Sequence, residues 1–309
     1  MQIYYGIQDF QPLTRAAVTS GTFDGVHLGH QKILARLREI AQTEGGESVV
    51  LTFWPHPRTV VANDSPNLKL LSTLDEKIEL LRQNGVNHLL VVPFTREFSE
   101  LSSEEYVQQI LVDKLGTKKL VIGYDHRFGR NREGGFDYLQ AHAPRFGFEI
   151  EEISRQEIEH LTISSTKIRQ ALEIGNLLVA NELLGRNYTF TGLVAKGRQL
   201  GRTLGFPTAN VQISETFKLI PADGVYAVRA HVRGNTYGGV MNIGLRPTVS
   251  GVGRTQEVHL FDFNEDIYGE TLTVELVGFV RAEQKFDGLE ALKAQIDLDC
   301  ERAEAMLND

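Results

Sequence analysis

The spacing of apolar residues in the first half of the chain predicts strands that alternate with helices. Near-continuous apolar runs, typical of strands, occupy residues 15–21, 47–54, 88–94, 118–125 and 147–153. Segments with helical spacing of apolar residues lie between several of them, as at 29–42 and 74–85. Such a pattern is typical of a parallel sheet covered by helices on both faces, so we expect an α/β domain here.

From about residue 188 the pattern changes to short segments rich in β-branched and aromatic residues. These segments, separated by Gly, Asn and Pro turns, are 188–195, 224–232, 236–244, 255–263 and 271–280. They predict a mostly antiparallel barrel or sandwich. The chain closes with helical apolar spacing over residues 288–307. We place the boundary near residues 182–188, which gives domains 1–184 and 185–309.

Composition and charge narrow the function classes. Hydrophobic residues make up 41% and charged residues 23%, as in ordinary globular proteins, and no apolar run reaches the roughly 18 residues that span a bilayer. Residues 1–12 lack a basic segment followed by an apolar core, and Cys300 is the only cysteine, so we expect no signal peptide and a reducing, cytoplasmic setting. The net charge of −8 argues against a surface that coats nucleic acid, and we expect neither a nucleic-acid nor a membrane partner.

The segment SGTFDGVHLGHQKIL, residues 20–34, runs from a predicted strand through a glycine-rich turn into a predicted helix. Unpaired N–H groups and a partial positive charge at a helix N-terminus suit a phosphate. His27 and His30 are three residues apart and share a face if the helix begins near them. The alternative is a plain turn with solvated histidines. The place on the first strand-to-helix turn, where open α/β sheets bind ligands, favours phosphate.

This segment resembles the H-x-G-H signature of the nucleotidylyltransferase superfamily, whose fold is Rossmann-like. The second signature of that superfamily has an analogue in ISSTKIRQAL, residues 163–172. Hydroxyls here can cap a helix, and the basic side chains add positive charge near phosphate. Taken alone, this segment is a plain helix cap with solvated basic residues; its pairing with the histidines favours a phosphate site. Its polar members are Ser164, Ser165, Thr166, Lys167 and Arg169.

Two further segments, TFWPHP (52–57) and GYDHRFGRNREG (123–134), resemble elements of the bacterial bifunctional riboflavin kinase/FAD synthetases. The family pattern has Asp where this chain has Trp54, and Phe where it has His126. Without the resemblance, the second segment is a loop with three arginines and an aromatic, which could hold a phosphate and stack on a ring or could be a solvated turn. The resemblance implies that the flavin is bound by His56, Asp125, Arg127 and Phe128.

A second glycine-rich segment, GRQLGRTLGFPTANV (197–211), opens the β-rich half. Its glycines recur every four residues and fit a loop whose N–H groups approach a polyphosphate, although the P-loop pattern is absent. Thr208 and Asn210 alternate on an extended segment, so their side chains project the same way. Two neutral oxygens suit a Mg²⁺ that keeps waters and phosphate as its other ligands. The alternative is a glycine-rich turn with surface polar residues.

The tract LGFPTAN (204–210) resembles the riboflavin kinase module, as do residues 238–249 and QEVHLFDFNEDIYG (256–269). The resemblance places Glu257 at the position of the catalytic carboxylate. Alternation along the strand puts Glu257 and His259 on one face, with the apolar residues beside them on the other. A carboxylate here can accept the proton of an attacking alcohol, whereas the alternative is a solvent-facing glutamate at a strand edge. In residues 238–249, Asn242, Gly244 and Arg246 are further candidates for this site.

The resemblance covers essentially the whole chain, with its motifs in the expected order. It implies a Rossmann-like FMN adenylyltransferase domain followed by a β-barrel riboflavin kinase domain, with riboflavin, FMN and ATP as substrates and Mg²⁺ as cofactor. A single-activity enzyme and a flavin-binding protein without catalysis remain alternatives, against which the intact motifs argue. The residues implied to bind ATP for adenylyl transfer are Gly21, Phe23, His27, His30, Ser164, Thr166 and Arg169, with the two histidines as catalytic. Those implied for the kinase are Glu257 as base, Gly197, Gly201, Gly205, Thr208 and Asn210 for ATP, and Thr208 and Asn210 for the metal.

Overall fold

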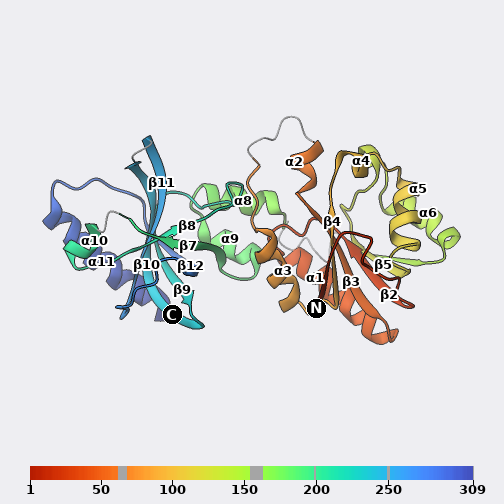
Figure 1. Ribbon diagram of the computed structural model, residues 1–309, viewed down its shortest axis with the longest axis horizontal. Coiled ribbons are helices and arrows are strands. Elements are labelled where there is room, and N and C mark those ends of the chain that lie inside the picture. The colour runs from red at the N-terminus through yellow and green to blue at the C-terminus, as the bar shows by residue number, and fades with distance from the viewer. Residues whose placement is uncertain (62–67, 154–162, 198–199, 249–250, 309) are drawn as a thin grey trace. The chain divides into compact units, whose positions relative to one another are not determined.

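The computed structural model (Figure 1) describes residues 1–61, 68–153, 163–197, 200–248 and 251–308. The chain forms two compact units, one of residues 1–68 and 72–164 and the other of residues 69–71 and 165–309. The second unit therefore includes two helices that precede the predicted boundary at 184/185. That boundary follows the sequence motifs and stays a prediction.

The first unit is built on a six-stranded sheet in the order β1-β4-β3-β2-β5-β6, in which every neighbouring pair is parallel. The predicted parallel sheet is confirmed. The strands are β1 (Gln2–Tyr5), β2 (Ala16–Ser20), β3 (Glu47–Trp54), β4 (His88–Pro93), β5 (Thr117–Gly123) and β6 (Glu149–Ile153). The apolar pattern did not predict β1, because this four-residue edge strand contains no buried residue.

Helices cover both faces of this sheet, as the alternation predicted (Figure 1). Ala17 of β2 packs in the cluster formed with α1 (Leu28–Thr43) and α3 (Leu74–Gln83), whereas Val18 packs in the cluster with η1 (Tyr106–Val112) and α6 (Phe136–Phe146). Successive residues of one strand thus serve opposite cores, which explains the near-continuous apolar runs. The shorter helical segments are α2 (Pro57–Val61), α4 (Arg96–Ser99), α5 (Ser103–Glu105) and η2 (Arg130–Arg132).

The second unit is a closed antiparallel barrel in the order β10-β11-β8-β7-β12-β9. A barrel rather than a sandwich forms because β9 pairs with both β10 and β12 and so closes the ring. The strands are β7 (Tyr188–Ala195), β8 (Ala209–Gln212), β9 (Gly224–Val232), β10 (Asn235–Thr248), β11 (Gly251–Leu260) and β12 (Thr271–Arg281). The helices are α8 (Ser165–Glu173), α9 (Leu177–Leu184), α10 (Leu200–Leu204) and the predicted C-terminal α11 (Leu289–Asn308).

Residues 69–71 belong to the barrel unit because the backbone there pairs with residues 217–219. The Leu70 N–H donates to the Phe217 carbonyl at 2.7 Å, and the Leu219 N–H donates to the Leu70 carbonyl at 2.8 Å. The buried Lys218 ammonium donates to the carbonyls of Leu71 and Thr189, each at 2.8 Å. A lysine that satisfies two carbonyls in this way has a structural role.

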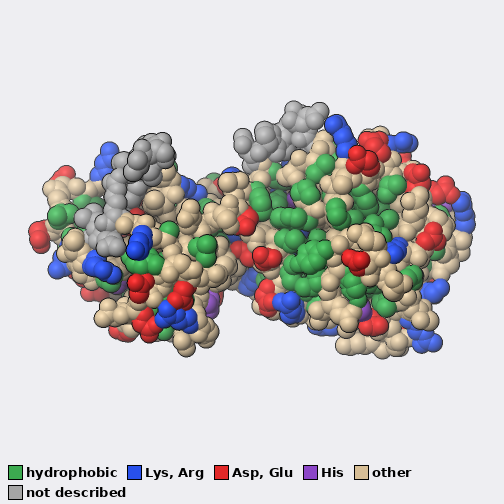
Figure 2. Space-filling view, viewed as in Figure 1, with side chains coloured by type: hydrophobic (Ala, Val, Ile, Leu, Met, Phe, Trp, Pro, Cys, Tyr) green, Lys and Arg blue, Asp and Glu red, His purple; other side chains and the backbone are tan. Residues whose placement is uncertain are grey.

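The surface carries charges of both signs. Figure 2 shows, on the face in view, Asp and Glu side chains interspersed with Lys and Arg on each unit, and hydrophobic side chains gathered in the middle of the first unit. No helix among the described residues is long and apolar enough to cross a bilayer.

Leu37 anchors α1, and with it the turn that carries the two histidines, because its side chain is fully buried against the sheet. We expect Leu37→Ala to lower the free energy of unfolding of the first unit by about 2–5 kcal/mol, through lost apolar burial and the cavity left behind. Chemical denaturation followed by circular dichroism measures this. The exposed Gln42→Ala on the same helix should change stability by less than about 0.5 kcal/mol. Equal stability of the two variants would contradict the assigned burial.

Candidate active sites

The turn between β2 and α1 holds the N-terminus of α1 at the carboxyl end of the sheet. His27 is the N-cap of α1, and its Nδ1 accepts the His30 backbone N–H at 3.4 Å. The turn is tight, since Phe23, Gly25 and Val26 all have positive φ, at 48°, 78° and 39°. A residue distant in the sequence stabilises the turn, because the Gly25 N–H donates to the Ser72 hydroxyl at 3.1 Å.

The two histidines lie together, as their spacing predicted. Their rings stack with centroids 3.6 Å apart and planes 15° apart, and Phe23 packs against His30 with centroids 5.1 Å apart. Burial lowers the pKa of His30 well below its usual range, and His27 and Lys77 lower it further. A neutral imidazole here can donate one N–H to a phosphate oxygen. The Nδ1 of His30 is buried and has no hydrogen-bond partner among the described residues, so the solvated-histidine alternative does not describe this turn.

Lys77 on α3 was missed by the sequence analysis, although it lies on the apolar face of the helix with Ile78 and Leu81. Its side chain is 1% exposed, and its Nζ lies 5.2 Å from the centroid of the Trp54 ring. Burial lowers the pKa of Lys77 to about 8, against the opposing effect of Asp24. Trp54, which stands where the family pattern has Asp, thus places an aromatic face against the buried Lys77 ammonium.

Asp24 and Ser72 form a second buried pair beside this turn, which the sequence analysis also missed. The Ser72 N–H donates to the Asp24 carboxylate at 3.2 Å. Ser72 directly precedes Thr73, the N-cap of α3, whose capping box with Glu76 fixes the start of that helix. The turn after β2 and the start of α3 are therefore one hydrogen-bonded assembly.

The loop after β5 joins the same edge of the sheet through His126. Its Nε2 lies 3.4 Å from the Ser20 hydroxyl, which also accepts the Tyr106 O–H at 3.0 Å. Burial lowers the pKa of His126 to about 4, and Arg127 and Arg132 lower it further. Because β2 and β5 are neighbours, this contact brings the predicted flavin loop beside the predicted phosphate turn.

The other predicted flavin residues occupy three different environments. Asp125 and Arg127 are exposed, whereas His56 is buried and its Nδ1 accepts the Arg58 N–H at 3.2 Å. Phe128 is 8% exposed and packs on Tyr106, with ring centroids 5.3 Å apart. Phe128 therefore supports the loop from within the core rather than presenting an open ring.

The second predicted phosphate motif spans the two units. Ser164 ends the first unit, and α8, which carries Thr166 and Arg169, belongs to the second. Thr166 is exposed, whereas Arg169 is buried. The helix begins at Ser165, where the hydroxyl-rich segment predicted it.

In the barrel, strand register places three polar residues in one row. Glu257 of β11 lies directly opposite Asn210 of β8 on one side and Asn242 of β10 on the other. Such directly opposite side chains have Cβ atoms about 5 Å apart. Their neighbours Val258 and Leu260 are buried, so the predicted alternation of faces along β11 is confirmed.

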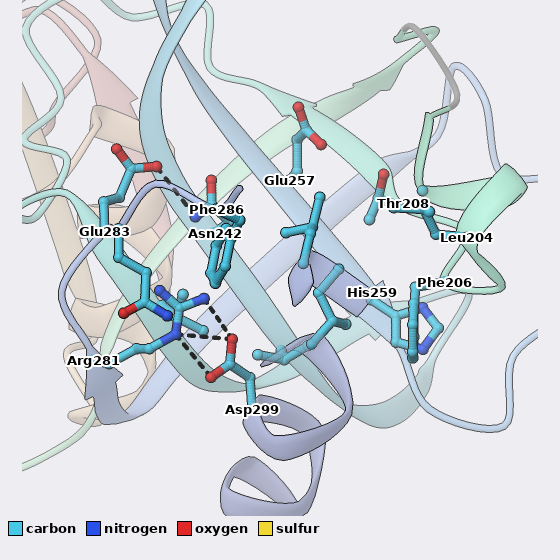
Figure 3. Close-up of a pocket in the computed structure, with 16 residues that line it drawn as sticks. Leu204, Phe206, Thr208, Asn242, Glu257, His259, Arg281, Glu283, Phe286 and Asp299 are labelled. Carbon is cyan, nitrogen blue, oxygen red and sulfur yellow. Dashed lines mark hydrogen bonds and ion pairs between the residues drawn. The ribbon is translucent and has the colours of Figure 1, made fainter. Parts of the chain in front are cut away.

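A cavity of about 280 Å³ opens beside this row (Figure 3). Thr208, Asn242, Glu257 and His259 line its polar part, and Figure 3 shows the Glu257 carboxylate and the Thr208 hydroxyl directed to the same side. Apolar side chains continue the wall, among them Phe206, Phe286, Leu292 and Ile296. A ligand that combines a flat apolar ring with a polar chain fits this division.

An ion pair between the half-buried Arg281 and the buried Asp299 lines the cavity beside α11. The Arg281 guanidinium donates to both carboxylate oxygens of Asp299, Nε to Oδ1 at 2.8 Å and Nη2 to Oδ2 at 2.7 Å. The Gln295 amide donates a further hydrogen bond to Asp299 Oδ1 at 2.9 Å. No local sequence pattern predicts this pair, because the two residues are 18 positions apart.

Close backbone approach accounts for two of the three predicted loop glycines. A Cβ on Gly197 would lie 2.2 Å from the Asn210 amide nitrogen, and one on Gly201 would lie 2.3 Å from the Phe206 carbonyl oxygen. The backbone at Gly197 therefore covers the Asn210 side chain, and Gly205 adopts a φ of +92° after the unpredicted α10. Residues 198–199 and the side chain of Arg246 lie outside the described residues.

Gly244, a further candidate from residues 238–249, borders the same row of polar side chains. A Cβ there would lie 1.8 Å from a carboxylate oxygen of Glu283, so a side chain at this position would displace that carboxylate. The same carboxylate accepts the Asn242 amide N–H at 3.3 Å. Glu283 thus reaches the row that contains Glu257.

Comparisons with known proteins cover both units. A family described as FAD synthetase matches residues 10–167, and one described as riboflavin kinase matches residues 184–307. Proteins named bifunctional riboflavin kinase/FMN adenylyltransferase are 42% identical in Pseudomonas fluorescens, over 99% of this chain and 98% of that protein, and 40% identical in Haemophilus influenzae, over 100% of both. A solved Streptococcus pneumoniae structure, described as a macrolide-efflux protein, has the same fold, with a TM-score of 0.88, 31% identity and 97% coverage of each chain.

The lowered pKa of His126 should make the stability of the first unit depend on pH. Its folded pKa lies at about 4, below the unfolded value, so the unfolded chain binds the proton first and stability falls as the pH drops. Between about pH 7 and about pH 5, wild type should lose about 2 kcal/mol more of its free energy of unfolding than His126→Phe. Denaturant titrations at both pH values measure the difference. Equal losses in the two proteins would contradict a His126 held neutral.

Proposed function

The chain belongs to the bifunctional riboflavin kinase/FMN adenylyltransferase family, and on this premise we propose which residues carry each of its two reactions. It phosphorylates riboflavin with ATP to give FMN and ADP, and it then transfers the adenylyl group of a second ATP to FMN, which gives FAD and pyrophosphate. The observation that carries the assignment is that both modules match along one chain. In support, His27 and His30 stack in the first unit, and Glu257 lies between Asn210 and Asn242 in the barrel. By the sequence motifs, residues 1–184 serve adenylyl transfer and residues 185–309 serve phosphorylation. The composition and single cysteine support a cytoplasmic setting.

In the barrel, Glu257 accepts the proton of the ribityl 5′-hydroxyl of riboflavin. The hydroxyl oxygen then bonds to the γ-phosphorus of ATP, the bond from that phosphorus to the bridging oxygen breaks, and ADP leaves with the electron pair. The apolar wall of the cavity receives the flavin ring. We assign Gly197, Gly201 and Gly205 to the phosphates of ATP. We assign the reacting hydroxyl to the polar row and the flavin ring to the apolar wall because the two lie side by side in the cavity.

The donor set of the barrel fits a magnesium ion that is held mainly by phosphate. Among the described residues no three His, Cys, Asp or Glu side chains cluster as a metal site. The candidate protein ligands are the neutral oxygens of Thr208 and Asn210. Thr208 lines the cavity, and Asn210 lies opposite Glu257. We assign the Thr208 hydroxyl and the Asn210 amide oxygen to this ion, which offsets phosphate charge when bound.

In the first unit, catalysis consists of positioning and charge stabilisation. The phosphate of FMN is already ionised near neutrality, so its oxygen attacks the α-phosphorus of ATP without a general base, and pyrophosphate leaves. His27, His30 and the N-terminus of α1 hold the triphosphate. Gly21 and Phe23 shape the turn beside them. From the sequence motifs, the proposal adds Ser164, Thr166 and Arg169 to the ATP site, and His56, Asp125 and Arg127 to the flavin site. Phe128 contributes to the flavin site by supporting its loop from the core.

Purified protein incubated with riboflavin, ATP and Mg²⁺ should produce FMN first and FAD afterwards, measured by chromatography of the flavins. Omission of Mg²⁺ should abolish the phosphorylation step, because the neutral oxygens of Thr208 and Asn210 cannot by themselves offset the charge of the phosphates. FMN alone would indicate a single-activity kinase, and FAD formed only from added FMN would indicate a single-activity adenylyltransferase. Binding without either product would indicate a flavin-binding protein.

A matched pair of variants tests the division between the units. His30→Ala should lower adenylyl transfer from added FMN at least about 100-fold and leave riboflavin phosphorylation intact, because it removes a donor to the phosphates. Glu257→Gln keeps the shape but removes the base, so it should lower phosphorylation by about 100-fold or more with adenylyl transfer unchanged. Each variant is the folding control for the other. Loss of both activities in one well-folded variant would refute the two-site assignment.

A further inference from the structure

Lys77 is a buried charge that the proposed mechanism has not used. Its side chain is 1% exposed, yet among the described residues its ammonium makes neither a hydrogen bond nor an ion pair. The buried Lys218 of the other unit is a useful contrast, because its ammonium donates to two carbonyls at 2.8 Å. An unpaired buried ammonium is costly, so its presence calls for a ligand of opposite charge.

The surroundings of Lys77 are those of the adenylyl-transfer turn. Its Nζ lies over the ring of Trp54, the last residue of β3, and β3 ends beside β2 at the carboxyl edge of the sheet. Asp24 from the turn and His30 from α1 are the titratable groups that face it. The Asp24 carboxylate is already engaged by the Ser72 N–H.

Groups that can bind an anion gather at this end of the sheet. The ammonium of Lys77 adds to the partial charge of the α1 N-terminus and to two imidazoles that offer donors. The Nδ1 of His30 is buried without a partner among the described residues, and so points independently to a missing ligand. An anion with several oxygens would satisfy all of these groups together.

We propose that Lys77 is a polyphosphate-binding residue of the adenylyl-transfer site. Its ammonium binds the triphosphate of ATP beside His27 and His30, and it offsets the charge that collects on pyrophosphate as the bond to the α-phosphorus breaks. The ring of Trp54 holds the ammonium in place before ATP arrives. This role rests on the adenylyl transfer proposed above.

The first test compares Lys77→Met with Lys118→Met, an exposed lysine on β5 of the same unit. Lys77→Met should raise the KM for ATP in adenylyl transfer about tenfold or more, with the KM for FMN changed less than about twofold. Riboflavin phosphorylation should be unchanged in both variants, and Lys118→Met should leave both reactions intact. A purely structural role would not separate the KM for ATP from that for FMN.

The second test uses Trp54, the single tryptophan of the chain, as a built-in reporter. Titration of flavin-free wild type with MgATP should change its fluorescence saturably, because the ammonium above the ring shifts toward the phosphates. Lys77→Met should weaken the apparent affinity about tenfold. The pKa of Lys77 lies at about 8 through burial, so the wild-type affinity should fall as the pH rises through this value, where His30 is already neutral.

The outcomes separate this inference from the proposed function. Wild type that makes FAD, together with a folded Lys77→Met that keeps its KM for ATP, would overturn the role of Lys77 and leave adenylyl transfer standing. Wild type that makes no FAD but binds MgATP through Lys77 would support the binding role and refute the transfer. If Lys77→Met does not fold, the wild-type titration decides: affinity that falls above about pH 8 supports the proposal, and affinity independent of pH overturns it.

Discussion

Strand register is the constraint on which both sites depend. In the barrel, the pairing of β8, β11 and β10 places Asn210, Glu257 and Asn242 in one row beside the cavity. A slip of one residue would turn Glu257 into the barrel and expose Val258, so the buried apolar face enforces the position of the carboxylate. In the first unit, parallel pairing brings the carboxyl ends of β2, β3 and β5 to one edge, where the turns that follow them meet.

Burial then decides the protonation of the groups at that edge. His30 and His126 are both held neutral by desolvation, one facing the phosphate turn and the other bonded to Ser20. Neutral histidines act as hydrogen-bond donors rather than as fixed charges. Lys77 and the start of α1 supply positive charge beside the neutral histidines, and Arg127 and Arg132 act on His126. This arrangement suits the proposed adenylyl transfer, which needs no general base.

The charged side chains that lie out of solvent in the two units differ in whether the protein itself provides their hydrogen-bond partners. Arg281 and Asp299 are paired through two parallel hydrogen bonds, and Lys218 is satisfied by carbonyls, so these groups hold the architecture. Within the part of the chain that the structure describes, Lys77 has an aromatic face and a nearby carboxylate that accepts a hydrogen bond from Ser72. The difference distinguishes charges that stabilise the fold from one that is available to a ligand.

The sequence by itself determined the architecture and the motifs. Apolar runs separated by helical patterns indicate a parallel sheet, alternation predicted the face that carries Glu257, and the H-x-G-H spacing predicted adjacent histidines, because these features depend on local periodicity. Only the tertiary structure decided the closure of the barrel, the pairing of Arg281 with Asp299, the buried Lys77 over Trp54 and the packing of Phe128 into the core. These features depend on contacts between residues far apart in the chain, whose burial and partners no local pattern encodes.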